Sequence, residues 1–266
     1  MKHIFSKQNR ALLSELVRTD FKLRYQGSVL GYAWSLLRPL LLFVILYIVF
    51  VKFLKIGNGI PNYPIYLLLG IVLWNFFAEM TNQGLSSIVS RGDLVRKIRI
   101  PRWLIIVSTS ISALINLTLN MTVVIVLALI SHMNFMATSV FLPLVLLEIY
   151  LLALGITLIL SAMFVRYRDV SYIWEVVLQA GFYATPIIYP LSLITSIKVQ
   201  KLILINPLAQ AIQDARNLFV TTETVTNSDV FHSQFTRLIP ISIVFGILIF
   251  GIFYFKKHAK NFAEDL

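Results

Sequence analysis

The sequence predicts an all-α integral membrane protein with six transmembrane helices. Of its 266 residues, 58% are hydrophobic and only 13% are charged, whereas a soluble domain carries about 25% charged residues. The mean hydropathy is +0.81. Six apolar runs reach the roughly 20 residues that a helix needs to cross a bilayer. The chain has no cysteine, which excludes disulfides, thiolate metal sites and cysteine nucleophiles.

The first predicted element is an amphipathic helix over residues 8–24. Leu12, Leu16 and Phe21 recur there at helical spacing, so we expect one apolar face that lies along the inner surface of the membrane. Cations occupy other positions of this helix: Arg10, Arg18 and Lys22. We expect residues 1–32 to form a cytoplasmic tail with this interface helix. Periodicity alone favours a plain surface anchor over a collar around a docking site.

The six spans are expected within a single transmembrane domain over residues 33–266. They are predicted at Ala33–Phe53, Pro64–Gly84, Trp103–Ile130, Val140–Val165, Tyr172–Tyr189 and Leu238–Phe255. The pattern also allows the second span to continue past Gly84 as a polar extension of the same helix. The fifth is short, and its last residues carry two prolines that oppose a continuing helix. The longest outer segment, about 190–237, contains a short helix with an apolar stripe and an exposed polar loop.

The distribution of positive charge predicts that both termini are cytoplasmic. With that orientation, 17 of the 23 Lys and Arg residues lie on the cytoplasmic side, as the positive-inside rule requires. The net charge of +11 then suits anionic lipid headgroups or an acidic protein surface rather than nucleic acid. No cleavable signal peptide is expected, because the first thirty residues are charged and polar.

Polar residues recur at helical spacing inside the predicted spans. Three such seams each place their hydrogen-bonding groups along one helical face: Asn75–Glu79–Asn82–Ser86, Ser108–Ser112–Asn116–Asn120 and Glu175–Gln179–Tyr183. A further carboxylate, Glu148, lies in the fourth span. Such groups either join helices together or face water. Packing is favoured for the Ser/Asn seam, and a water-facing lining is favoured for the seam that contains Glu175.

An enzymatic site is not expected. The four histidines are isolated, with no His-Glu-x-x-His spacing for zinc. The chain also lacks the Gly-x-x-x-x-Gly-Lys-Ser/Thr loop that binds nucleotide phosphates. We therefore expect no metal or cofactor in this chain.

Several stretches in order along the chain resemble one family. They are "LVRTDFKLRYQGSVLGYAWSLLRPL" (Leu16–Leu40), "VRKIRIPRW" (Val95–Trp103), "FVRYRDV" (Phe164–Val170), "ATPIIYP" (Ala184–Pro190) and "NPLAQAIQDAR" (Asn206–Arg216). Together they resemble the membrane, or permease, subunit of bacterial ABC exporters of lipid-linked polysaccharides, such as O-antigen, teichoic acid and rhamnan. The resemblance covers nearly the whole chain.

This resemblance implies a homodimeric half-transporter in the inner or plasma membrane, with two copies of a separate ATPase subunit that holds ATP and Mg²⁺. The amphipathic helix, with Arg10, Arg18 and Lys22, and the basic loop at about 85–102 are then expected to contact the ATPase. The coupling residues in that loop would be Arg91, Asp93, Arg96, Lys97, Arg99 and Pro101, with Pro101 ending the coupling helix. A plain positive-inside anchor is the alternative.

The resemblance also implies a glycan channel lined by the first and fifth spans, with short re-entrant helices that close its outer side. The expected lining residues are Tyr47, Glu175, Gln179 and Tyr183. The expected outer gate contains Pro186, Tyr189, Pro190, Asn206 and Pro207. Candidates to meet the lipid pyrophosphate are Arg24, Arg38, Arg166 and Arg168, although topology alone would also explain these cations. The alternatives are an ABC permease for a drug or small lipid, an ion-coupled secondary carrier that uses a buried glutamate and, with least support, a membrane-embedded transferase.

Overall fold

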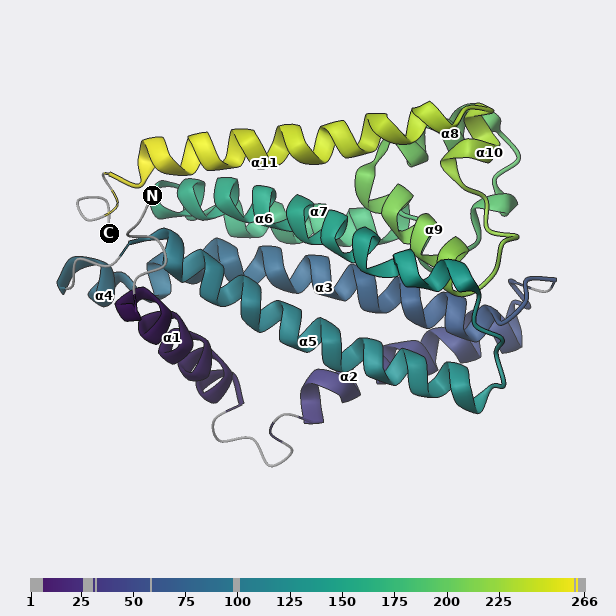
Figure 1. Ribbon diagram of the computed structural model, residues 1–266, viewed down its shortest axis with the longest axis horizontal. Helices are drawn as coiled ribbons and strands as arrows, with labels where there is room; N and C mark the ends of the chain where they lie inside the picture. Colours follow the sequence, from purple (N-terminus) through teal and green to yellow (C-terminus); the bar gives the residue numbers. More distant parts are fainter. Residues whose placement is uncertain are drawn as a thin grey trace.

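The structure is a computed structural model that describes residues 7–25, 31, 33–57, 59–97, 101–260 and 262, and these residues form helices and connecting turns without a strand. The long helix α3 (Tyr63–Ser90) lies at the centre of the bundle, and 78% of its apolar stretch is buried (Figure 1). By contrast, α2 (Ala33–Leu46) and its π-helical continuation η1 (Tyr47–Phe53) lie at the periphery, where 6% of the stretch is buried.

Three further long helices complete the bundle. They are α5 (Trp103–Ile130), α6 (Leu142–Arg166), which follows the short η2 (Ala137–Phe141), and α11 (Leu238–His258), which follows η4 (Gln234–Arg237). Helix α3 packs against both α5 and α6, and α6 packs against α11 on its other side. Glycines permit the closest of these contacts, because a Cβ on Gly155 of α6 would lie 2.8 Å from the Cα of Leu248 in α11. Small residues at such crossings let helix backbones approach closely in membranes.

The described residues contain five helices long and apolar enough to span a membrane. These agree closely with five of the predicted spans, and α3 includes the predicted polar extension. The predicted fifth span is shorter than expected: α7 (Val170–Ala184) has 15 residues, about 22 Å of helix against a hydrocarbon core of about 30 Å. It ends before Tyr189 because the residue preceding Pro186 is forced out of the α region, and Thr185 is extended, with φ −89° and ψ 136°.

Short helices gather at the two opposite ends of the bundle. At one end lie α1 (Lys7–Tyr25) and α4 (Gly92–Lys97); at the other lie α8 (Ile197–Ile205), α9 (Pro207–Phe219) and α10 (Asn227–Phe231), after the single turn η3 (Leu191–Leu193) (Figure 1). Helix α1 packs against α5 and buries Leu16, while Arg10, Arg18 and Lys22 are exposed. The predicted amphipathic pattern of this helix is therefore present.

Helix α9 is more deeply buried than its sequence pattern predicts. The side chain of Asn206 caps it by accepting a hydrogen bond from the backbone N–H of Leu208 at 3.0 Å, and Pro207 occupies the first turn, where its missing N–H costs nothing. Helix α9 packs against α3, α6, α8 and α11. Most of its polar residues are buried, among them Asp214 and Arg216, as are Leu208, Ile212 and Phe219 of the predicted apolar stripe.

Candidate functional site

A polar cavity of about 340 Å³ lies between α2, α3 and α5. It brings together two seams that are far apart in the sequence. Asn75, Glu79 and Asn82 reach it from α3, and Asn116 and Asn120 reach it from α5. Helix α2 closes the third side with Trp34, Ser35, Arg38 and Pro39. The volume is at the lower end of the range of about 300–1,000 Å³ that is usual for ligand pockets.

Hydrogen bonds fix the side chains at the centre of this cavity. The carboxamide of Asn116 donates to Oε1 of Glu79 at 2.6 Å, and Gln83 donates to the same oxygen at 3.3 Å. Asn120 donates to the backbone carbonyl of Asn116 at 2.8 Å and to that of Ser35 at 3.4 Å. These contacts join all three helices through polar groups.

The cavity has a closed floor and an open mouth. Val72, Phe76 and Asn116 are buried, and Oδ1 of Asn116 has no hydrogen-bond partner among the described residues. At the other side, Trp34 is 45% exposed, and Arg38 and Asn82 are exposed as well. The two halves of the Ser/Asn seam of α5 therefore differ: its asparagines line the cavity, whereas its serines pack within the protein.

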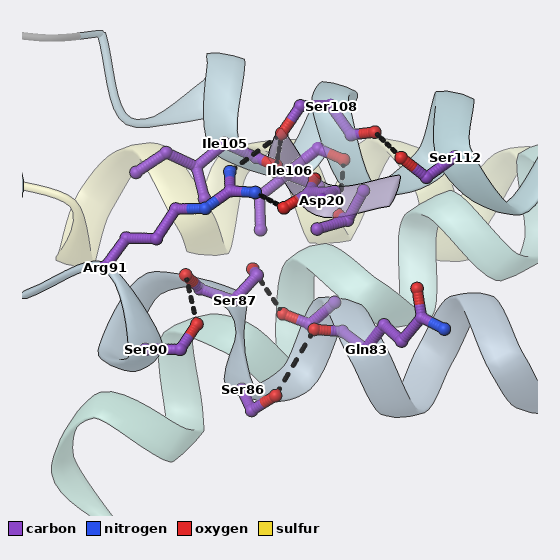
Figure 2. A network of polar contacts seen from close by, with 12 residues as sticks. Asp20, Gln83, Ser86, Ser87, Ser90, Arg91, Ile105, Ile106, Ser108 and Ser112 are labelled. Atoms are coloured by element: carbon purple, nitrogen blue, oxygen red, sulfur yellow. Dashed lines mark hydrogen bonds and ion pairs between the residues drawn. The ribbon is translucent and has the colours of Figure 1, made fainter. Parts of the chain in front are cut away.

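One serine of this seam, Ser108, contacts Arg91, a largely buried arginine that follows the C-terminal end of α3 (Figure 2). Arg91 follows the last residue of α3, forms an ion pair with Asp20 of α1 and donates to Oγ of Ser108 in α5 at 2.8 Å. The side chain of Arg91 is 13% exposed and that of Asp20 is 21% exposed. Burial lowers the pKa of Arg91 from its ordinary value. One guanidinium thus links three helices at the end where α4 begins.

The predicted coupling residues therefore occupy different environments. Arg91 faces into the protein, whereas Asp93, in the first turn of α4, is exposed. Arg96 and Lys97 belong to the last turn of α4, but their side chains and all of Arg99 lie outside the described residues. Helix α4 ends at Lys97, before Pro101. Pro101 instead lies in the turn that leads into α5: its carbonyl accepts a hydrogen bond from the N–H of Leu104 at 2.9 Å.

Arg91→Gln is expected to loosen α1 from the bundle. The substitution removes the charge that pairs with the half-buried Asp20, and a hydrogen bond to a charged group contributes about 1.5–3 kcal/mol. Amide hydrogen exchange in Lys7–Tyr25 should become about tenfold faster. Arg18→Gln on the exposed face of α1 is the control and should leave exchange unchanged. Equal exchange in the Arg91→Gln variant and the unaltered protein would show that the ion pair does not hold α1.

The predicted channel-lining seam lies on one exposed face of α7. Glu175, Gln179 and Tyr183 are all exposed, and Tyr183 is 66% exposed. The opposite face of α7 packs on α3: Trp174 donates to the hydroxyl of Thr81 at 3.1 Å. Tyr47, the other predicted lining residue, is half-buried at the start of η1.

One predicted outer-gate residue, Pro186, contacts an arginine whose role the sequence did not indicate. Arg216 of α9 is fully buried. Its guanidinium donates to the carbonyls of Pro186 at 2.5 Å, Ile187 at 2.7 Å and Tyr66 at 3.0 Å, and it lies 3.8 Å from the centre of the Tyr66 ring. Arg216 thereby fastens the turn after α7 to the central helix α3.

The remaining gate residues stabilise the same turn and the start of α9. Tyr189 donates from its hydroxyl to the carbonyl of Tyr183 at 3.1 Å, and Pro190 is buried just before η3. The predicted orientation counts Arg216 among the six cations on the outer side and gives it no role. In the structure, Gly70 of α3 leaves room for Arg216, because a Cβ at this position would collide with Nη2 of Arg216.

Of the four arginines predicted to meet a pyrophosphate, the three with described side chains do not share one site. Arg38 lines the mouth of the cavity, whereas Arg166 and Arg168 are exposed at the end of α6 and beyond it. Arg166 lies against the ring of Tyr167 and Arg168 against that of Phe164, at 5.6 and 5.1 Å from the ring centres. The side chain of Arg24 is outside the described residues.

The fold and these sites define a multi-pass helical membrane protein with polar groups in its interior and short helices at each end. The chain belongs to the ABC-2 type transporter family, whose model matches residues 11–220. Membership of this family fits a non-catalytic membrane component and implies an ABC ATPase as its partner. The protein is accordingly a transporter component of the inner or plasma membrane.

Curated relatives match over nearly the full chain. The O-antigen export system permease protein RfbA of Myxococcus xanthus is 32% identical over 260 residues, which cover 97% of this chain and 96% of that protein. Two O-antigen export system permease proteins RfbA of Klebsiella pneumoniae are each 28% identical over 256 residues, which cover 96% of this chain and 95% of those proteins.

Proposed function

We propose that the chain is the transmembrane subunit of an ABC exporter that moves lipid-linked polysaccharide from the cytoplasm across the inner or plasma membrane. ATP hydrolysis in a separate subunit drives the transport. The observation that carries this proposal is the full-length similarity to O-antigen export permeases. An ABC permease for a drug or small lipid is the second candidate, because the family description itself names no substrate.

In this proposal two copies of the chain form the channel. The exposed face of α7 carries Glu175, Gln179 and Tyr183, and a carboxylate facing lipid is costly. In a dimer, this face would line a water-filled channel between the two protomers. Helices α7 and α2 of both protomers would surround this channel. Helix α7 counts as a short fifth pass. Six passes would return the chain to the side on which it began, in agreement with the charge distribution.

The end that carries α1 and α4 is the proposed contact with the ATPase. The two helices lie at the same end of the bundle (Figure 1), and Arg91 ties α1 to the end of α3, directly before α4. A push by the ATPase on α4 would therefore reach α1 and α5 through the same ion-pair network. At the opposite end of the bundle, the transported glycan would pass the segment that includes α8 and α9. The position of this segment depends on Arg216.

Replacing Arg96 and Lys97 together with alanine is expected to weaken the contact with the ATPase subunit. Both cations lie in the last turn of α4, and charge pairs at a docking surface govern association more than fold. We expect at least tenfold less ATPase subunit to co-purify, with a corresponding loss of export. Alanine at Lys198 and Lys201, in α8 at the opposite end, is the charge-matched control. Normal co-purification and export with both α4 cations removed would exclude the coupling role.

Deletion of the gene tests the substrate class. The proposal expects lipid-linked polysaccharide to accumulate on the cytoplasmic side of the membrane, and the wild-type gene should restore export. A deletion strain that displays normal surface polysaccharide and instead retains a drug or a small lipid would support the second candidate.

A further inference from the structure

The polar cavity lies between α2, α3 and α5, and none of the predicted channel-lining residues lines it. Its lining is unusual for a membrane interior because carboxamides predominate: Asn75, Asn82, Gln83, Asn116 and Asn120. Each carboxamide offers both hydrogen-bond donors and an acceptor oxygen. Such a lining is complementary to a ligand whose own groups both donate and accept, which is the property of a hydroxyl group.

The charge of the lining favours a neutral ligand. Among the described residues, the cavity is lined by one carboxylate, Glu79, and one guanidinium, Arg38, as its charged side chains. Asn116 and Gln83 both direct N–H groups at Glu79, so this carboxyl group already has hydrogen-bond partners within the protein. An anion such as a phosphate group would meet a single arginine together with a nearby carboxylate, whereas phosphate sites usually cluster several cations or backbone N–H groups.

The shape of the cavity favours a compact ligand with an apolar face. Phe76 forms part of the floor, and Trp34, which is 45% exposed, stands at the mouth. Aromatic faces pack well against C–H groups because the face of the ring is electron-rich. At the floor, Oδ1 of the buried Asn116 has no partner among the described residues. Leaving such an acceptor unpaired costs about 1–3 kcal/mol, and a ligand hydroxyl would satisfy it.

We propose that this cavity is a binding site for a neutral sugar residue. Hydroxyl groups of the sugar would form hydrogen bonds with the carboxamides, including Asn116. The C–H face of the sugar ring would lie against Trp34 or Phe76. The identity of the sugar rests on the proposed function: the cavity would take one unit of the glycan that the transporter exports. The site would hold the glycan beside the channel, on helices that belong to one protomer.

The test is a binding measurement on the full chain in lipid nanodiscs, without ATP. The probe is the set of short neutral oligosaccharides released by mild acid hydrolysis from the host's own surface polysaccharide, and binding is detected by saturation-transfer NMR. Asn82→Leu and Trp34→Ala alter the exposed mouth of the cavity, so neither removes a buried contact. Asn217→Leu on α9 and Phe53→Ala on η1, where Phe53 is 76% exposed, are the matched controls. Thermal unfolding of every variant checks its fold.

We expect the wild-type chain to bind the saccharide, and each mouth variant to raise the dissociation constant about three- to tenfold, as the loss of one hydrogen bond or contact predicts. The controls should bind as the wild type does. The proposal is overturned if no saccharide binds, if the mouth variants bind normally, or if inorganic phosphate displaces the saccharide. A deletion strain that accumulates lipid-linked polysaccharide while the chain binds no saccharide would contradict this site alone. Saccharide binding without such accumulation would contradict the export function alone.

Discussion

Arg216→Met is expected to destabilise the protein by about 3–5 kcal/mol, because several buried carbonyls lose a charged donor and each unsatisfied group costs about 1–3 kcal/mol. The variant would leave the carbonyls of Pro186 and Ile187 without the donors that hold the turn after α7. It would also remove the stacking of the guanidinium on Tyr66. The measurement is the unfolding of purified protein in detergent, followed by circular dichroism.

Two further variants define the cause of this effect. Lys198→Met removes an exposed cation from α8 and should change stability by no more than about 0.5 kcal/mol. Arg216→Lys keeps the charge but cannot reach three carbonyls with a planar fork, so it should be destabilised nearly as much as Arg216→Met. If Arg216→Lys is as stable as the wild type, charge alone matters and the carbonyl contacts do not hold the turn.

Gly155→Leu is expected to have the second large effect, a loss of about 3 kcal/mol through overpacking between α6 and α11. A Cβ at this position would lie 2.8 Å from the Cα of Leu248 and 3.0 Å from the carbonyl carbon of Ile247. Both are backbone atoms and cannot rotate away, so the two helices would have to separate. Unfolding by added SDS, read by circular dichroism, would report the loss.

The matched control lies on the helix that α6 contacts. A Cβ on Gly246 of α11 would meet nothing within 4 Å, so Gly246→Leu should change stability by less than about 0.5 kcal/mol. Equal stability of the Gly155→Leu and Gly246→Leu variants would mean that α6 and α11 are not held at this close distance.

The long elements of the fold were predictable because hydrophobic length alone specifies them. The predicted span Trp103–Ile130 coincides with α5, where twenty-eight residues contain no charge and no proline. The prediction placed the end of the fifth span at Tyr189, which is too late, because it followed the apolar run past Thr185. Only the restriction that Pro186 places on the preceding residue ends the helix there.

The candidate sites were predictable as polar seams but not as assemblies. Spacing along one helix shows that Asn75 and Glu79 share a face, but it does not reveal that Asn116 of another helix lies 2.6 Å from Glu79. The same limit applies to Arg216, whose partners Pro186 and Tyr66 lie 30 and 150 positions away in the chain. Which helices are neighbours depends on tertiary packing, and the spacing of residues in a single sequence does not reveal this packing.

In the proposed mechanism this chain conducts a glycan while a separate ATPase supplies the work. The most direct measurement uses proteoliposomes loaded with labelled lipid-linked polysaccharide and follows its appearance on the opposite side. We predict translocation only when the vesicles contain both this chain and its ATPase subunit together with Mg²⁺ and ATP. Equally fast translocation by vesicles that contain this chain alone would contradict the account.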